Sequence, residues 1–205
     1  DNMLKITNEA KLMAIDPRLL SDDYPMHTDG KLFKCAEQVA RIWEESKEQK
    51  STQIIFSDVG TPKENQFDAY HEMKRLLIEL GIPENQIAFI HDAKDDVQRE
   101  ALFEKVRTGE VRVLLGSTEK LGTGTNVQHK LLAVHHLDVP WRPSDLTQRD
   151  GRIVRQGNEN KEVQIYRYVA KDSFDSYLWQ VQENKLRFIN QIMSNRSYAR
   201  SADDV

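Results

Sequence analysis

Residues 111–158 read VRVLLGSTEKLGTGTNVQHKLLAVHHLDVPWRPSDLTQRDGRIVRQGN. Two short apolar runs lie in this stretch, at 111–115 and 131–137, and each is followed by a polar loop that contains glycine or proline. Apolar runs of this length, bounded by turn-forming residues, predict strands that are buried on both faces. The proline at 143 is typical of the first turn of a helix, so a helix is expected to follow the second strand.

The rest of the chain continues this alternation of strands and helices. Helices are predicted near 33–43, 67–80, 95–107, 143–154 and 174–193, and further strands at 53–57, 87–90 and 163–169. Strands that alternate with helices of ~10–15 residues imply an α/β fold with a parallel sheet between helices, here followed by a long C-terminal helix. Ligands bind such sheets at the carboxyl ends of the strands. We therefore expect the loops after Phe56, Ile90, Leu115 and Leu137 to carry function.

The pattern divides the chain into three segments. Residues 1–30 lack a clear period, and Pro17 and Pro25 interrupt them, so they are interpreted as a strap or linker. Residues 31–170 form the predicted α/β domain, and residues 171–205 form a helical extension.

Composition restricts the class of protein. The chain has 205 residues, 30% of them charged, and a formal net charge of -4, which argues against a free-standing and strongly basic DNA-binding module. No apolar run reaches the ~18 residues of a membrane span, and no signal peptide is visible. Cys35 is the only cysteine, which excludes an internal disulfide or a cysteine-rich zinc site. A reducing, cytoplasmic setting and a monomeric chain are expected.

The stretch at 148–158 carries the most specific chemistry. Residues Gln148, Arg152 and Arg155 are spaced four and three apart, which places them on one face of a helix. Two guanidinium groups one turn apart suit a phosphate whose charge grows in a transition state. For an isolated arginine pair, the alternative of a solvated basic face would be preferred.

Two other loops could meet phosphate, ribose or nucleic acid. The loop at 116–127 follows a predicted strand and combines glycines with hydroxyl side chains, which suits close approach of the backbone to a phosphate or ribose. It is not a dinucleotide fingerprint, because the third glycine is missing. The loop at 138–143 holds Trp141 between prolines, which fits either core packing or contact with a sugar or base.

Together these stretches resemble the C-terminal RecA-like lobe of superfamily 2 helicases, most closely the SNF2-like branch. That branch typically shows Thr-x-x-x-x-x-Gly-x-Asn, then Asp-x-x-Trp-x-Pro, then Gln-x-x-x-Arg-x-x-Arg-x-Gly-Gln. The matching residues, in the same order and spacing, are Thr118, Gly124, Asn126, Asp138, Trp141, Pro143, Gln148, Arg152, Arg155 and Gly157. The sequence departs from the family at Asn158, in place of the final glutamine, and at Leu121-Gly122, in place of a glycine pair.

The resemblance implies roles for these residues. Arg155 would be the arginine finger on the γ-phosphate of ATP, with Arg152 beside it. The residues implied in ATP binding or in coupling of the lobes are Gln148, Gly122, Gly124 and Asn126. The residues implied in contact with the DNA backbone are Ser57 and Thr118, with Lys120 and Trp141 as secondary candidates. The chain is also similar to helicase segments of bacterial mobile-element proteins that carry a fused DNA methylase.

The sequence lacks the Gly-x-x-x-x-Gly-Lys-Ser/Thr loop and the Asp-Glu-x-His or Asp-Glu-Ala-Asp stretch that hold ATP and Mg²⁺. We therefore predict that this chain alone neither binds ATP tightly nor hydrolyses it. In a longer protein, a first RecA-like lobe upstream would bind ATP and Mg²⁺, and DNA would be the other partner.

Two alternatives stay open from the sequence. One is a non-catalytic DNA-binding or scaffold domain that kept the RecA-like fold, and the other is a nucleotide-binding enzyme of another doubly wound family. A metal site at His135 and His136 is not expected, because two adjacent histidines without further convergent ligands are more often packed or solvated.

Overall fold

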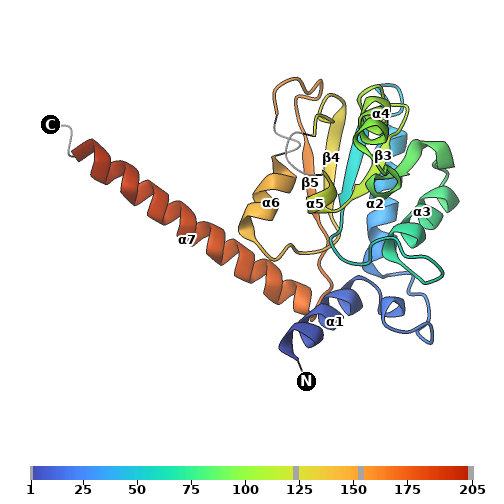
Figure 1. Cartoon of the computed structure of the whole chain (residues 1–205), viewed down its shortest axis with the longest axis horizontal. Coiled ribbons are helices and arrows are strands. Elements are labelled where there is room, and N and C mark those ends of the chain that lie inside the picture. Colours follow the sequence, from blue (N-terminus) through green and yellow to red (C-terminus); the bar gives the residue numbers. More distant parts are fainter. Residues whose placement is uncertain (1, 122–124, 152–154, 203–205) are drawn as a thin grey trace.

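The computed structural model describes residues 2–121, 125–151 and 155–202, with side chains described to residue 194. A parallel five-stranded sheet of order β2-β3-β1-β4-β5 lies between helices (Figure 1). This is the predicted α/β, RecA-like arrangement. The strands are β1 Thr52–Phe56, β2 Ile87–Phe89, β3 Val113–Gly116, β4 Leu131–His136 and β5 Gln164–Arg167.

The helices connect the strands and extend the chain at both ends. They are α1 Met3–Ile15, α2 Lys31–Glu45, α3 Ala69–Glu79, α4 Asp96–Arg107, α5 Thr118–Leu121, α6 Pro143–Asp150 and α7 Phe174–Ala202, with short 3-10 turns at Pro17–Leu19, Glu84–Gln86 and Ile90–Asp92. Capping side chains define where two of these helices begin. Asp68 and Asp95 accept hydrogen bonds from the backbone N–H groups of His71 and Gln98, which caps α3 and α4.

The two faces of the sheet bury separate cores because successive strand residues point to opposite sides. On one face, Ile55 packs with apolar residues of α2 and α3, such as Val39 and Met73. On the other face, Ile54 packs with Phe103 and other apolar side chains of α4. Every residue of β1 is buried, as expected for the central strand of a covered parallel sheet.

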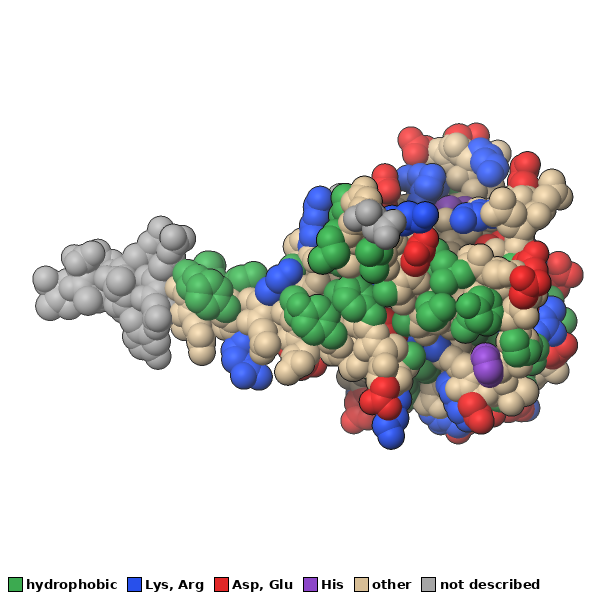
Figure 2. All heavy atoms as spheres, turned by 90° about the horizontal axis from the view of Figure 1, so that it is seen from below, with side chains coloured by type: hydrophobic (Ala, Val, Ile, Leu, Met, Phe, Trp, Pro, Cys, Tyr) green, Lys and Arg blue, Asp and Glu red, His purple; other side chains and the backbone are tan. Residues whose placement is uncertain are grey.

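The N-terminal helix and the base of the C-terminal helix meet at the carboxyl edge of the sheet. The strand β5 leads into α7, which projects from the body, and α1 lies beside the base of α7 (Figure 1). Seen from the side of α1, hydrophobic side chains are exposed around this region (Figure 2). They include Met3, Leu4, Ile6 and Met13 of α1 and Tyr177 and Phe188 of α7.

The first thirty residues differ from the expectation of an aperiodic strap. They contain the 13-residue helix α1, which Asn2 caps and which ends at Ile15, two residues before Pro17. Only its inward side is buried, through Lys11, Ala14 and Ile15. Its weak apolar periodicity explains why the sequence pattern did not reveal it. The division of the chain at residues 30 and 170 stays a prediction.

Within the described residues, each helix is too short or too polar to cross a membrane.

Candidate functional site at the carboxyl edge of the sheet

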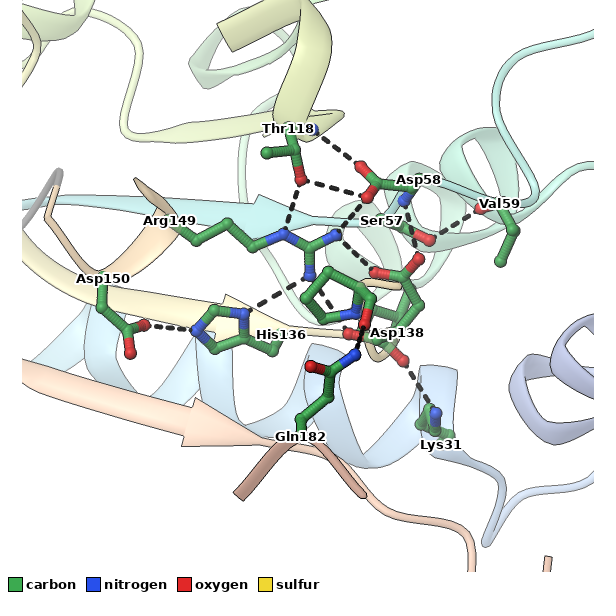
Figure 3. A network of polar contacts seen from close by, with 12 residues as sticks. Lys31, Ser57, Asp58, Val59, Thr118, His136, Asp138, Arg149, Asp150 and Gln182 are labelled. Carbon is green, nitrogen blue, oxygen red and sulfur yellow. Dashed lines mark hydrogen bonds and ion pairs between the residues drawn. The ribbon is translucent and has the colours of Figure 1, made fainter. Parts of the chain in front are cut away.

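Three loops meet at the carboxyl edge of the sheet, where the fold class predicted a site. Asp58 follows β1, Thr118 follows β3 and Asp138 follows β4, and Figure 3 shows their side chains around Arg149 of α6. The three strands are adjacent in the sheet, so residues that are 20 or more positions apart in sequence become neighbours. Helix α6 starts with Pro143, whose fixed φ suits the first turn of a helix.

Arg149 is the centre of this site and is completely buried. Its Nε donates to Thr118 Oγ1 at 2.8 Å, and its NH1 donates to the Asp138 carbonyl at 3.1 Å. Its NH2 lies 2.9 Å from Asp138 Oδ1 and 2.8 Å from Asp58 Oδ2. The planar guanidinium thus binds two carboxylates, a hydroxyl and a carbonyl at once, which an ammonium group could not do with the same geometry.

The loops after β1, β3 and β4 are also bonded directly to one another. The Thr118 N–H and hydroxyl donate to the two oxygens of Asp58 at 2.7 and 3.0 Å. The Asp58 N–H donates to Asp138 Oδ2 at 2.9 Å. With Arg149 these bonds form a closed network, which we call the Arg149 network: Asp58, Thr118, Asp138 and Arg149. The network fixes α6 to all three loops.

His136 extends the network toward the end of α6. Its Nε2 lies 2.7 Å from Asp150 Oδ1, and its Nδ1 lies 3.4 Å from Arg149 NH1. An arginine can only donate, so Nδ1 is the acceptor and Nε2 carries the proton that is donated to Asp150. The imidazole is therefore neutral. Burial and the charge of Arg149 lower the pKa of His136, against the opposing effect of Asp150.

The charged groups of the network stabilise one another in their ionised forms. Burial disfavours the charged form of Asp138, but Arg149 and Lys11 outweigh it, so the pKa of Asp138 lies below its ordinary value. Burial also opposes the charge of Arg149, but Asp138 and Asp58 raise the pKa of its guanidinium. The network is thus a charged structural unit in which each group depends on its partners.

The two hydroxyls predicted to touch DNA are not free in this structure. Ser57 is 1% exposed, and its hydroxyl donates to the Val59 carbonyl at 2.7 Å. Thr118 is buried, and its hydroxyl binds Asp58 and Arg149. Direct contact of either hydroxyl with a phosphate would require these bonds to open. The DNA role of these residues stays a prediction.

Other predicted residues lie at or near the same edge with exposed surface. Lys120 is exposed on α5, and Trp141, 48% exposed, precedes α6. Gln148 is half-buried on α6. Asn126 is exposed, and its carbonyl accepts a hydrogen bond from Arg107. Their proposed contacts with DNA or ATP stay predictions.

Arg155 lies close to the loop after β3, but not on the predicted helix. Its NH1 donates to the Thr125 carbonyl at 3.1 Å, and its side chain is exposed. Helix α6 ends at Asp150, and Arg155 lies outside any helix. The prediction that Gln148 and Arg155 share the face of one helix is therefore wrong. Three predicted site residues lie outside the described residues: Gly122, Gly124 and Arg152.

The sequence reasoning missed Arg149 and Asp58. Arg149 follows Gln148 directly and does not share its helix face, so it had no part in the predicted arginine array. One signal was available in the sequence. Asp138 directly follows a predicted strand and Arg149 lies in the helix after it, and a buried arginine needs a carboxylate partner.

The two histidines at the end of β4 do not face one another. His135 and His136 are consecutive in β4 and point to opposite faces of the sheet, so they cannot bind one ion together. Across residues 2–121, 125–151 and 155–202, no group of three or more His, Cys, Asp or Glu side chains is arranged to hold a metal ion.

Comparison with known proteins places this geometry in a family. Residues 34–157 match the model of the helicase conserved C-terminal domain, which is more than half of the chain. The match contains β1 to β4, α6 and the whole Arg149 network.

Curated relatives are similar over parts of the chain. Defense against restriction protein B of Escherichia phage P1 is 34% identical over 86 residues, which is 42% of this chain and 4% of that protein. The uncharacterized ATP-dependent helicase YqhH of Bacillus subtilis (strain 168) is 32% identical over 85 residues, or 42% of this chain and 15% of the relative. An uncharacterized ATP-dependent helicase of Mycoplasma pneumoniae is 28% identical over 82% of this chain and 16% of its own length. The chain therefore spans less than a fifth of these relatives.

Solved structures share the fold. The C-terminal part of the Fun30 ATPase domain superposes with a TM-score of 0.57 at 21% identity, over 84% of this chain and 53% of that one. The DUF1998 helicase MrfA bound to DNA superposes with a TM-score of 0.52 at 18% identity, over 76% of this chain and 20% of that one.

Proposed function

Because the chain belongs to the family of the helicase conserved C-terminal domain, we propose that it is the second motor lobe of an ATP-dependent DNA helicase or translocase of the SNF2-like kind. The observation that carries the proposal is the position of Arg155. Arg155 is exposed beside the loop after β3, and it follows a helix that the buried Arg149 anchors to the carboxyl edge of the sheet. An exposed guanidinium close to this edge can be presented to a phosphate held by another domain.

The proposed mechanism divides the ATPase site between two lobes. ATP and Mg²⁺ would be held by a first RecA-like lobe, because this sequence has no phosphate-binding loop. Closure of the lobes would bring Arg155 and Arg152 to the γ-phosphate, with Gln148, Asn126 and the glycines at 122 and 124 at the nucleotide or between the lobes. An arginine finger contributes about 10³–10⁵-fold in rate.

DNA is proposed to bind along the same edge. Lys120 and Trp141 are exposed there, and an ammonium and an indole suit a phosphate and a sugar or base. Ser57 and Thr118 would join them only if their present hydrogen bonds exchange for phosphate contacts during the cycle. Such contacts carry no sequence information, which fits a motor that moves along DNA.

The test is DNA-stimulated ATP hydrolysis by a polypeptide that carries both lobes. Arg155→Ala is expected to lower turnover by about 10²-fold or more with nucleotide binding largely kept. The matched control is Arg41→Ala, which removes an exposed arginine of α2 that pairs with Glu45. The control should hydrolyse ATP at the original rate.

Two results would contradict the proposal: equal hydrolysis by Arg155→Ala, or hydrolysis by this chain alone. The first would favour the non-catalytic DNA-binding or scaffold alternative, and the second would favour a nucleotide-binding enzyme of another doubly wound family. The mobile-element setting, a fused methylase and a monomeric chain stay proposals that this assay does not address.

A further inference from the structure

Side chains of α2 and α7 bind the segment 137–143, which joins β4 to α6. Lys31 Nζ donates to the Leu137 carbonyl at 2.8 Å, and Gln182 Nε2 donates to the Pro140 carbonyl at 2.6 Å (Figure 3). Both side chains are buried. Two carbonyls of one short loop are thus bound by donors from α2 and α7.

The two donors belong to one buried assembly. Lys31 also forms an ion pair with Asp175, in the first turn of α7. Lys31, Asp175 and Gln182 all lie outside the residues 34–157 that match the helicase family. Residues just before and well after the matched range therefore bind a loop that lies inside it.

A third contact comes from α1 and is of a different kind. Lys11 is 1% exposed, and its Nζ lies 4.4 Å from the centroid of the Trp141 ring. Among the residues that the structure describes, this ammonium has no hydrogen-bond partner. Burying a charge without an acceptor is unfavourable unless other groups compensate. Here the face of Trp141 and the carboxylates of Asp138 and Asp58 attract it.

This contact is sensitive to small movements of α1. The attraction between an ammonium and an indole holds within about 6 Å of the ring, and no hydrogen bond fixes the ammonium in place. A shift of α1 by part of a turn would remove Lys11 from Trp141 and bring its charge closer to water. The loop at 137–143 would then lose one of its supports, while Lys31 and Gln182 kept theirs.

We propose that α1 and α7 form a clamp on residues 137–143 in which Lys11 is a positioning residue. Through Trp141 and Asp138, Lys11 positions the loop that leads into α6, and Arg149 of α6 binds the same Asp138. The effect on ATP turnover rests on the proposed motor function. The clamp itself does not, since its contacts lie within this chain.

The clamp is tested by fluorine NMR on this chain labelled with 5-fluorotryptophan. The chain has three tryptophans, and Trp141→Phe identifies the resonance of interest. Lys11→Met keeps the length of the side chain and removes the ammonium, and it should shift or broaden the Trp141 resonance. Lys11→Arg should keep the resonance near its original position, because a guanidinium also binds an indole face. The control is Lys5→Met, which changes a lysine of α1 that is 76% exposed.

The folded state provides a second check. Lys11→Met should still unfold cooperatively, at a similar or lower temperature, because relief of a buried ammonium without a hydrogen bond is opposed by loss of a charge that attracts the buried Asp138. If Lys11→Met does not fold, Gln182→Met, which removes the bond to Pro140, should shift the same resonance. A Trp141 resonance unchanged in folded Lys11→Met, or in Gln182→Met if Lys11→Met does not fold, would overturn the clamp.

The effect of Lys11 on ATP turnover is tested in the polypeptide that carries both lobes. Lys11→Met should lower kcat by about threefold or more at an unchanged KM for ATP, and Lys11→Arg should restore it. If Arg155→Ala abolishes hydrolysis but Lys11→Met leaves kcat unchanged, the positioning role is wrong and the motor survives. If Arg155→Ala has no effect, the proposed function fails, and the NMR result still decides the clamp.

Discussion

Arg149→Met is the substitution that tests the site most directly. It keeps an apolar stem of similar length and removes the guanidinium that joins three loops to α6. Most of the lost stability comes from Asp138, whose side chain is 2% exposed and stays buried without its cation. The side chain of Asp58 is 28% exposed, so water can take over part of the role of Arg149 there. Without Arg149, Asp138 keeps the N–H of Asp58 but has lost its nearest cation.

The expected cost follows from that burial. Removing one partner of a buried ion pair destabilises a protein by about 3–5 kcal/mol, because the other charge stays buried. For a chain of this size, each kcal/mol lowers the melting temperature by about 2–4 °C, so a decrease of about 6–20 °C is expected. Urea unfolding followed by circular dichroism measures the free energy, and thermal melting measures the temperature.

A double-mutant cycle separates this explanation from simple loss of packing. Asp138→Asn removes the buried charge at nearly constant shape, so Arg149→Met with Asp138→Asn should be more stable than the sum of the single effects predicts, by about 1 kcal/mol or more. Additive effects, or a cost below about 1 kcal/mol for Arg149→Met, would refute the view that Arg149 holds the three loops together.

Three further predictions concern buried groups outside the Arg149 network. Burial and the neighbouring His136 lower the pKa of His135 from 6.5 to about 3. The unfolded chain therefore binds the extra proton, and stability should decrease as the pH falls from about 6.5 toward 3. NMR should find no titration of the folded His135 imidazole above pH 4, and a midpoint near 6.5 would contradict its burial. A Cβ on Gly116 would lie 2.7 Å from Leu121 Cδ1, so Gly116→Ala should destabilise by about 1–3 kcal/mol in urea unfolding, with partial recovery when combined with Leu121→Ala. Burial raises the pKa of the Cys35 thiol to about 12, so iodoacetamide should label it far more slowly in the native chain than in denaturant, and equal rates would show that the thiol is accessible.

Much of the fold was predictable because the signals are local. A strand in a covered parallel sheet needs a short apolar run, and a helix needs apolar residues on one side, and both patterns are written in consecutive residues. The predicted strands and helices of the α/β domain are all present, with ends that differ by a few residues. The motif order at 118–158 likewise located the loops that meet at the carboxyl edge.

The failures have a common physical cause. Helix α1 has no strong apolar stripe, and it is held by a cap at Asn2 and by contacts with α7, which lies more than 150 residues away in sequence. The helical spacing of Gln148 and Arg155 did not show that α6 ends at Asp150 and that Arg155 lies outside a helix. The sequence likewise does not reveal that the hydroxyl of Ser57 donates to the Val59 carbonyl, and the DNA role of Ser57 stays a prediction.

The sequence by itself determined the class of fold, the order of the strands and helices and the family to which the motifs point, because periodicity and motif spacing depend only on neighbours along the chain. Only the tertiary structure decided that Arg149 is buried and that Lys11 lies over Trp141. Arg149 binds residues 11 and 31 positions earlier in the chain, and Lys11 approaches Trp141 from the opposite end. Whether an arginine or lysine is solvated or buried against a carboxylate depends on which distant segments the sheet brings to the same edge, and no local pattern records that.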